Sequence, residues 1–391
     1  MASIVSKRLD RLSQYLFVQV RQGLGHRSAY KPIDLSVGDP DEGVNQQILE
    51  EAFRVALRAK GANRYPPGRG QIGLRRAIAR WMQDRYGARF DPEREIAVCS
   101  GSKEGIAHLI HVLIDPGQKL LTGSLAYPVY GRAAGLAGGT TEILTMEENN
   151  GFWLDYAKSK GGKAICFNYP NNPTGACVTR EHFKELTAWA KKKDVFMISD
   201  AAYNEMSFGN RAAPSIFEIP QARGRAVEFH SFSKSFGLPG LRLGWVCGEP
   251  DVISALLKLK DTYDSGVCNW VQSVGQFLLE MPERDAELRR LRAIYGRRRA
   301  VAEEALGAMG FGVFRSGATF YVWARPGRSH FTAELKERVN VLTVPGEGFG
   351  PGGNSYMRFA LCQSEGRIKE ALARVASVVD LASGRRQKQR S

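Results

Sequence analysis

Residues 231–245 decide the fold, and they read Ser-Phe-Ser-Lys-Ser-Phe-Gly-Leu-Pro-Gly-Leu-Arg-Leu-Gly-Trp. The segment lies between two runs that are typical of β-strands, Ala226–His230 and Gly244–Gly248. Lys234 stands between small hydroxyl side chains, and Arg242 follows it among glycines. An amine placed in this way can bond to an aldehyde as an imine, while the hydroxyls and the arginine hold a phosphate nearby. A lone Ser-x-Ser-Lys is more often a surface loop, but the whole segment favours this chemistry.

The alternation of strand and helix extends along the chain on both sides of this segment. Strands separated by helices predict an α/β fold with a mostly parallel sheet that is covered on both faces. Ligands of such sheets bind outside the carboxyl ends of the strands. The other predicted strands are Glu95–Cys99, Lys119–Thr122, Ala164–Asn168 and Val195–Ser199, and the predicted helices between strands include Lys103–Ile114, Arg180–Lys192 and Asp251–Tyr263.

The pattern changes after residue 283, where a second, smaller α+β domain is predicted. We expect residues 1–40 to form an N-terminal arm and part of the small domain, residues 41–284 a large domain, and residues 285–391 the small domain. The elements expected in the last part are a charged helix over Glu283–Met309, strands at Gly312–Phe314, Thr319–Ala324, Val339–Val344 and Ser355–Ala360, and a helix over Glu365–Leu381.

The composition excludes several classes of protein. The chain has 391 residues, of which 43% are hydrophobic and 24% charged, with no apolar stretch long enough to span a membrane and no secretory signal at its start. The net charge of +15 accompanies neither a nucleic-acid reading motif nor interleaved aromatics, so nucleic-acid binding is not expected. The 6 cysteines form no C-x-x-C pair, and the 6 histidines show no metal-ligand spacing. We therefore predict a cytoplasmic protein without disulfides or a metal.

Polar residues that follow other predicted strands give further candidates. Asp200 ends an apolar run, and Tyr203 lies shortly after it. Asn172 occurs in residues 169–175, which read Tyr-Pro-Asn-Asn-Pro-Thr-Gly. Ser102 opens a predicted helix, where free backbone amides suit a phosphate. Taken singly, a turn, a Pro-Gly loop and a helix cap would also explain these residues.

Taken in order, these motifs resemble the class I and II aminotransferases of fold type I, which depend on pyridoxal phosphate. The resemblance covers nearly the whole chain. It implies that Lys234 holds the cofactor as a Schiff base and later acts as the catalytic base. It also implies that Asp200 pairs with the protonated ring nitrogen, and that Tyr203 and Asn172 contact the phenolic oxygen of the ring.

The resemblance assigns roles to further residues. Arg358 lies in a predicted strand with apolar neighbours, where an arginine is unfavourable unless it is paired; a structural ion pair would explain it, but the resemblance implies a clamp for the substrate carboxylate. Tyr65 is expected to reach the cofactor phosphate of a partner subunit, which implies a homodimer. The remaining implied contacts are Gly101, Ser102, Lys103, Ser231, Ser233 and Arg242 with the cofactor, Tyr127 stacked on its ring, and Gly38 and Tyr15 with the substrate.

Within the class, the sequence is most similar to the LL-diaminopimelate aminotransferases. That likeness rests on residues 14–17, 101–109 and 200–203, and on residues 214–220 leading into 228–234. Gly68 and Arg69 depart from it, because that family has an acidic residue in this loop to meet the distal ammonium of diaminopimelate. The amino donor therefore stays open. Two other functions also stay open, a lyase or oxidase on the same fold and a regulator without enzymatic activity.

Overall fold

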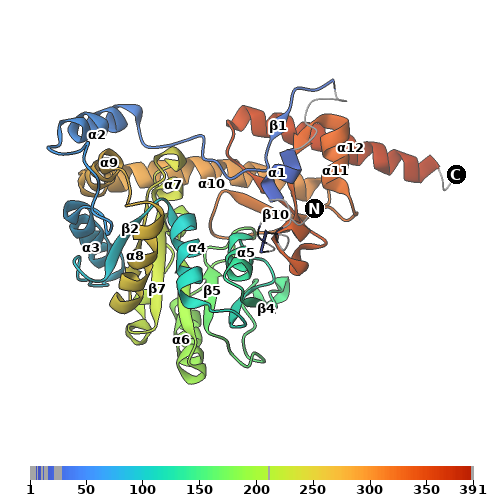
Figure 1. The fold of residues 1–391 in the computed structure, drawn as a ribbon. Coiled ribbons are helices and arrows are strands. Elements are labelled where there is room, and N and C mark those ends of the chain that lie inside the picture. The colour runs from blue at the N-terminus through green and yellow to red at the C-terminus, as the bar shows by residue number, and fades with distance from the viewer. Residues whose placement is uncertain are drawn as a thin grey trace.

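The computed structural model describes residues 6, 8–9, 12, 16–21, 29–209 and 212–388. Its largest sheet has 7 strands in the order β2-β8-β7-β6-β5-β3-β4, and Figure 1 shows this sheet at the centre of the large part of the molecule. Only β8 runs antiparallel to its neighbours within this sheet, so the predicted α/β fold with a mostly parallel sheet is confirmed. The strands are β2 (Ile96–Cys99), β3 (Lys119–Gly123), β4 (Thr140–Leu144), β5 (Ala164–Asn168), β6 (Phe196–Asp200), β7 (Ala226–Ser231) and β8 (Gly244–Gly248).

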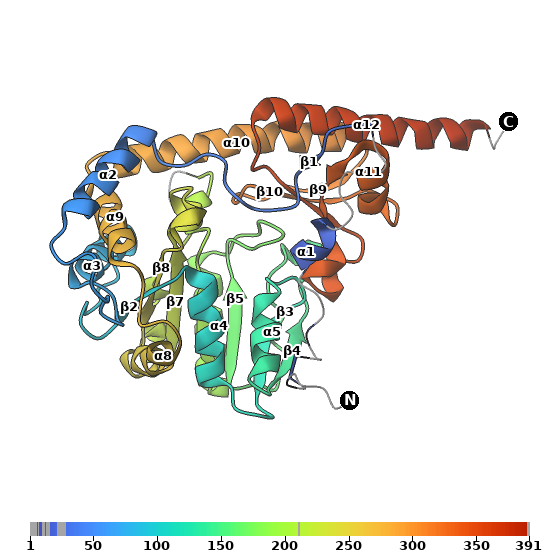
Figure 2. The ribbon, with the colours of Figure 1, turned by 45° about the horizontal axis from the view of Figure 1, so that its top comes forward.

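The strands are apolar on both faces because both faces are covered by other elements. In β5, Ala164 and Cys166 belong to one buried cluster, whereas Ile165 and Phe167 belong to another. Figure 2 shows α4, α5 and α8 in front of the sheet. The helices of this part are α2 (Gln46–Arg58), α3 (Ile72–Tyr86), α4 (Ser102–Leu113), α5 (Val129–Leu136), α6 (Arg180–Lys193), α7 (Phe232–Ser235), α8 (Pro250–Tyr263) and α9 (Asn269–Glu280).

Strand β4 is absent from the sequence-based prediction. It pairs with β3 alone at the edge of the sheet, and only Leu144 among its residues is buried. Its first residues, Thr140, Thr141 and Glu142, therefore lack the apolar run by which the inner strands were recognised. An edge strand of this kind carries a weaker hydrophobic signal than a strand that is buried on both faces.

A smaller antiparallel sheet of 4 strands, in the order β12-β13-β10-β9, forms the second part of the molecule. Figure 2 shows α10 running from the neighbourhood of α2 and α9 to β9 and β10, beside α12. The short strand β1 (Ile33–Asp34) pairs in parallel with β11 (Val341–Leu342), which ties the early chain to this part. The remaining elements are α1 (Leu16–Arg21), α10 (Arg284–Ala308), β9 (Gly312–Phe314), β10 (Tyr321–Arg325), α11 (Phe331–Val339), β12 (Val344–Pro345), β13 (Met357–Ala360) and α12 (Glu365–Lys388).

The single strand predicted over Val339–Val344 is wrong. Val339 ends α11, and Asn340 takes a left-handed backbone conformation with a φ of 52°. The chain then pairs first with β1 and afterwards with β13, so that it crosses from one sheet to the other. The division of the chain at residues 40 and 284 stays a prediction. Among the described residues, no helix combines the length and the apolar character that crossing a membrane requires.

Candidate active site

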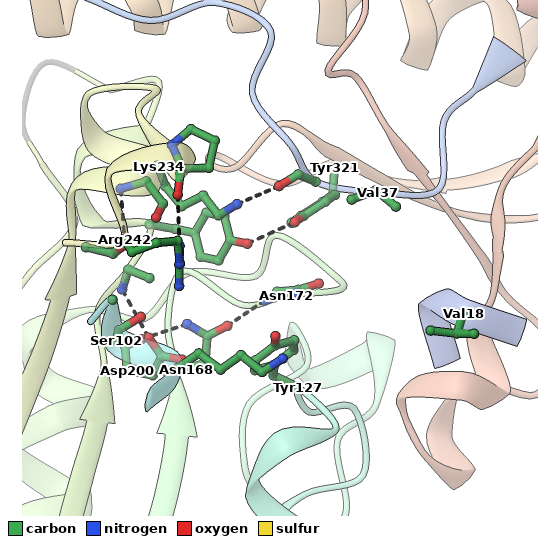
Figure 3. A pocket seen from close by; sticks show the side chains of 18 residues that line it. Val18, Val37, Ser102, Tyr127, Asn168, Asn172, Asp200, Lys234, Arg242 and Tyr321 are labelled. Atoms are coloured by element: carbon green, nitrogen blue, oxygen red, sulfur yellow. Dashed lines mark hydrogen bonds between the residues drawn. The ribbon is translucent and has the colours of Figure 1, made fainter. Parts of the chain in front are cut away.

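A cavity of about 670 Å³ lies where β2, β5, β6 and β7 end. These strands are parallel, so their carboxyl ends share one edge of the sheet, as the sequence predicts for a ligand site. Figure 3 shows the side chains around this space. The residues that line the cavity are Val18, Val37, Gly38, Gly101, Ser102, Lys103, Tyr127, Asn168, Asn172, Asp200, Ala202, Tyr203, Ser231, Ser233, Lys234, Pro239, Arg242 and Tyr321.

Lys234 projects its amine into the cavity from the short helix α7. The hydroxyl of Ser231 accepts a hydrogen bond from the amide of Ser233 at 3.2 Å and so starts this helix directly after β7. The amine of Lys234 donates to the backbone carbonyl of Gly38 at 2.5 Å. Burial lowers the pKa of Lys234 to about 8. The lysine therefore loses its proton more readily than an ordinary lysine, as nucleophilic and general-base chemistry requires.

Asp200 is a buried carboxylate at the end of β6. Tyr130 donates its hydroxyl to one carboxylate oxygen at 2.6 Å, and the amide of Ala202 donates to the other at 3.3 Å. Burial raises the pKa of Asp200 to about 6, although these two hydrogen bonds lower it. A buried carboxylate of this kind gains from a cationic partner, so Asp200 is suited to pair with a protonated ligand.

The hydroxyl groups of Tyr203 and Tyr321 lie 2.9 Å apart on the cavity wall. Burial raises the pKa of Tyr203 above its ordinary value, and Tyr321 adds to the rise, so Tyr203 stays a neutral hydrogen-bonding group. Position 38 needs a glycine beside this pair, because a Cβ there would lie 1.9 Å from the Tyr321 hydroxyl oxygen. The backbone of Gly38 can therefore approach the cavity closely.

The N-terminus of α4 forms an anion cradle between β2 and α4. Gly101, Ser102 and Lys103 line the cavity at this point, where the first amides of a helix have no partner within it. Arg242 takes a left-handed conformation with a φ of 51°, and it donates to the carbonyl of Ser100 at 3.3 Å. The guanidinium group therefore stands beside the helix N-terminus, as a phosphate site requires.

Arg358 lies just behind the cavity wall and has no exposed surface. Its Nη1 donates to the side-chain oxygen of Asn172 at 2.6 Å, and its Nη2 donates to the carbonyl of Ser36 at 2.5 Å. The guanidinium group also lies over the ring of Tyr321, 4.1 Å from the ring centre. A buried guanidinium group that is oriented from two sides in this way is suited to bind a carboxylate.

Two residues that the sequence analysis discussed, Tyr65 and Arg69, do not line the cavity of their own subunit. Tyr65 is 91% exposed, and Tyr15 lies outside the described residues. Arg69 donates to the carbonyl of Arg94 at 3.0 Å and does not line the cavity. The expectation that Arg69 faces a distal substrate charge therefore has no support within one subunit.

The sequence analysis did not single out three further residues of the site. Tyr130 donates a hydrogen bond to Asp200. Tyr321 shares a hydrogen bond with Tyr203, and the guanidinium group of Arg358 lies over its ring. Asn168 donates to the backbone carbonyl of Asp200 at 2.6 Å and accepts from the amide of Asn172 at 2.7 Å. An asparagine as the last residue of an apolar strand is a signal that could have identified Asn168. The two tyrosines carry no such signal in the sequence.

The described residues hold no group of three or more His, Cys, Asp or Glu side chains that could bind a metal.

Comparisons with known proteins agree with the geometry of the cavity. Residues 30–375 match the family model of class I and II aminotransferases. The LL-diaminopimelate aminotransferase of Moorella thermoacetica is 36% identical in an alignment of 386 residues that covers 96% of this chain and 98% of the relative.

Solved structures show the same likeness. An aminotransferase from Staphylococcus aureus superposes with a TM-score of 0.87 at 27% identity, over 96% of this chain and 100% of that one. A probable N-succinyldiaminopimelate aminotransferase from Thermus thermophilus superposes with a TM-score of 0.82 at 31% identity, over 93% and 99%. With a family match over most of its length, this chain belongs to the class I and II aminotransferases and is a pyridoxal-phosphate-dependent enzyme of that family.

Proposed function

We propose that this aminotransferase carries pyridoxal phosphate on Lys234 and moves an amino group between an α-amino acid and a 2-keto acid, in a site completed by two subunits. One observation carries the proposal. The buried amine of Lys234, the buried carboxylate of Asp200 and the anion cradle of α4 line the same cavity. These three features match the aldehyde, the ring nitrogen and the phosphate of one ligand.

The anion cradle fits the phosphate group of the cofactor. Gly101 has a φ of 78°, and a Cβ there would lie 2.6 Å from a guanidinium nitrogen of Arg242. A Cβ at Gly244 would lie 2.8 Å from the backbone amide nitrogen of Ser102. The two glycines therefore let Arg242 and the start of α4 approach the chain closely enough to border the cradle. The hydrogen-bond donors for the phosphate are the first amides of α4, the hydroxyls of Ser102, Ser231 and Ser233, and Arg242, with Lys103 beside them.

When bound, pyridoxal phosphate supplies an aldehyde that bonds to amines and a ring that accepts electrons from the α-carbon of the substrate. Asp200 would pair with the ring nitrogen and keep it protonated, and the two hydrogen bonds to its carboxylate orient it for this role. Lys234 takes the α-proton of the amino acid as general base and later returns it, and its lowered pKa suits both steps. Tyr203, Asn172 and Tyr127 line the same cavity, where the first two would donate hydrogen bonds to the cofactor and Tyr127 would pack against it.

Arg358 binds the α-carboxylate of the substrate. Its guanidinium group already meets Asn172 and Ser36 on two sides, so its direction is fixed before the substrate arrives. Gly38 lines the same corner of the cavity through its backbone. A substrate held in this way presents its α-hydrogen in one orientation, which decides which bond breaks.

A homodimer is supported by apolar side chains that are exposed on neighbouring elements. Leu57 on α2, Tyr65 before α3, Tyr263 at the end of α8 and Trp270 on α9 are all exposed. Helix α2 packs on α9, Asn269 at the start of α9 donates to the carbonyl of Arg64, and the turn after α8 packs against Pro66, so these elements are neighbours. A large exposed apolar region marks a protein interface. In the dimer, Tyr65 reaches the cofactor phosphate of the partner subunit.

Several classes of amino donor are compatible with the sequence. LL-diaminopimelate is the first donor to test, since the Moorella relative is named for it. Gly68 and Arg69 depart from that family, so dicarboxylic and aromatic amino acids belong in the same experiment.

The 6 cysteines are free thiols, and the cytoplasmic location inferred from them stays a prediction.

Half-reaction spectroscopy tests the proposal directly. Each amino acid of a panel is added to the purified enzyme without a keto acid, and the visible absorption of the enzyme-bound aldehyde is followed. We expect one class of donor to remove this absorption and to yield its keto acid without release of ammonia. Release of ammonia without an acceptor would favour the lyase or oxidase. A protein that stays colourless and takes up no pyridoxal phosphate would contradict the proposal entirely.

A further inference from the structure

Lys260 on α8 is a buried lysine that the proposed chemistry does not use. Its side chain has no exposed surface. The amine donates to Glu104 and to Asp264, each at 2.8 Å. Burial alone would lower the pKa of Lys260, but the Cys99 thiol and the two carboxylates raise it, so the amine stays charged. A charge that is buried in this way holds its partners in a fixed geometry.

The first partner, Glu104, connects Lys260 to the anion cradle. Glu104 lies in the first turn of α4, and its second carboxylate oxygen accepts from the backbone amide of Ser100 at 3.0 Å. A ring nitrogen of His108 lies 2.6 Å from the oxygen that also meets Lys260. Burial would raise the pKa of Glu104, but His108 and Lys260 lower it below the ordinary value. The carboxylate therefore fixes the chain directly before Gly101 and Ser102.

The second partner, Asp264, connects Lys260 to the segment that carries Tyr65. The other carboxylate oxygen of Asp264 accepts from the amide of Gly266 at 2.8 Å. Gly266 has a φ of 107°, and a Cβ there would lie 3.1 Å from the carbonyl oxygen of Pro67 and 3.2 Å from the ring of Pro66. The turn at Gly266 therefore packs directly against the chain that follows Tyr65.

We infer that Lys260 is a positioning residue that couples cofactor binding to subunit pairing, because it links the chain before the anion cradle to the turn that supports the Tyr65 segment. The inference rests on the proposed function, in which the cradle binds the cofactor phosphate and Tyr65 crosses to the partner. A phosphate in the cradle favours one position of Ser100 and Glu104. Lys260 and Asp264 transmit this constraint to the turn at Gly266, and so to the dimer contact made by the Tyr65 segment. By reciprocity, pairing tightens cofactor binding by the same factor.

Three variants separate the two arms of this link. Glu104→Gln keeps the shape of the side chain but offers one acceptor oxygen in place of two, so Ser100 and Lys260 cannot both be bonded. Asp264→Asn does the same to Gly266 and Lys260. Lys260→Met breaks both arms. As a matched control, Lys119→Met removes a lysine whose amine lies 2.7 Å from Glu142, at the amino end of β3, whereas the cavity lies at the carboxyl ends of the strands.

Two dissociation constants are measured for each protein: that of pyridoxal phosphate by absorbance titration of the apoprotein, and that of the dimer by sedimentation with and without cofactor. Glu104→Gln should weaken cofactor binding roughly tenfold with little change in the apoprotein dimer. Asp264→Asn should weaken the dimer by about the same factor. In Lys260→Met, the cofactor should no longer tighten the dimer, whereas Lys119→Met should match the wild type.

The outcomes are distinguishable from those of the proposed function. A wild-type protein that takes up no cofactor, or that stays monomeric with it, would contradict the proposed function and the coupling together. A wild-type protein that does both, with a Lys260→Met variant that changes only its melting temperature, would overturn the coupling alone. If Lys260→Met does not fold, the two carboxamide variants decide: a cofactor that still tightens the dimer by the wild-type factor in both of them would overturn the inference.

Discussion

Nη1 of Arg358 and the side-chain oxygen of Asn172 are joined by a hydrogen bond of 2.6 Å that connects the small sheet to the loop after β5. The two residues are 186 positions apart in the chain. A carboxylate bound by Arg358 therefore lies where both parts of the molecule meet the cavity. The same contact ties the substrate clamp to a residue that is expected to touch the cofactor ring.

Replacing this arginine should weaken substrate binding strongly. Arg358→Ala is expected to raise the KM for the amino donor by at least two orders of magnitude, because a desolvated, bidentate charge pair contributes roughly 3–5 kcal/mol. Steady-state kinetics with the best donor check this. Arg338→Ala, which removes an exposed arginine paired with Glu334 on α11, is the control. An unchanged KM in Arg358→Ala would remove this residue from the carboxylate role.

The covalent attachment of the cofactor depends on Lys234 alone. Lys234→Ala is expected to lose the visible absorption of the imine between cofactor and enzyme completely, since no other amine replaces its bond. Lys103 is the other lysine on the cavity wall, so Lys103→Met is the matched control and should keep the absorption. Borohydride reduction followed by peptide mapping locates the modified lysine. A reduced adduct on Lys103 would contradict the assignment.

The capture of cofactor by the apoenzyme should depend on pH through Lys234. Its pKa is lowered to about 8, so the reactive neutral amine is the minor form below pH 8 and the major form above it. The rate of capture should therefore rise with pH and level off just above pH 8. An Nα-acetyl-lysine solution, whose pKa of about 10.4 is ordinary, should show a rate that continues to rise. Stopped-flow absorbance at a series of pH values measures both, and a matching pair of profiles would contradict the lowered pKa.

The apoenzyme should also become more stable when Asp200 is neutralised. The folded-state pKa is raised from 3.8 to about 6, so the folded protein binds more protons than the unfolded chain between these values, and stability falls as pH rises through them. Above pH 6 the burial of this charge costs roughly 2–3 kcal/mol. Asp200→Asn should therefore raise the free energy of unfolding of the apoprotein at pH 7.

The contribution of Asp200 should vanish in acid. Below about pH 4 the wild-type carboxyl is protonated in both states, so the two apoproteins should unfold with equal free energies there. Urea denaturation from pH 4 to pH 8 measures the difference. With pyridoxal phosphate present, the order should reverse, because the variant loses the charge that pairs with the ring nitrogen. A variant that is less stable than the wild type at every pH without cofactor would contradict the raised pKa.

The residues that the sequence analysis assigned to the inner part of the site line one cavity because they follow apolar strands. Lys234, Asp200 and Asn172 stand after runs that are buried on both faces, and each run ends at the same edge of the sheet. Tyr321 and Tyr130 were not predicted because they come to the site by tertiary packing. Their side chains meet Tyr203 and Asp200 over 118 and 70 positions of sequence.

The direction of one surface side chain and the positions of several short strands could not be predicted from the sequence either. The direction of Arg69 depends on a hydrogen bond to the carbonyl of Arg94, a backbone group that any residue could supply. Strand β4 escaped prediction because only its last residue, Leu144, is buried. The left-handed residue Asn340 separates α11 from the short strands β11 and β12. A hydrophobic pattern does not indicate such a backbone conformation, so this boundary was not predicted.

The anion cradle should be sensitive to one methyl group at Gly244. A Cβ there would meet the backbone amide nitrogen of Ser102 at 2.8 Å and the carbonyl oxygen of His230 at 2.7 Å, and neither backbone can move like a side chain. Gly244→Ala is therefore expected to displace the start of α4 and to weaken the binding of pyridoxal phosphate by a factor of roughly ten to one hundred.

Gly240 offers a control within the same segment, because a Cβ there would have no heavy atom within 4 Å. Gly240→Ala should bind the cofactor as the wild type does. The measurement is absorbance titration with pyridoxal phosphate and, in parallel, with pyridoxal, which lacks the phosphate. Because Gly244 acts on the phosphate cradle, the loss in Gly244→Ala should be large for the first ligand and small for the second. An equal loss for both would place the effect on the aldehyde end and contradict the cradle.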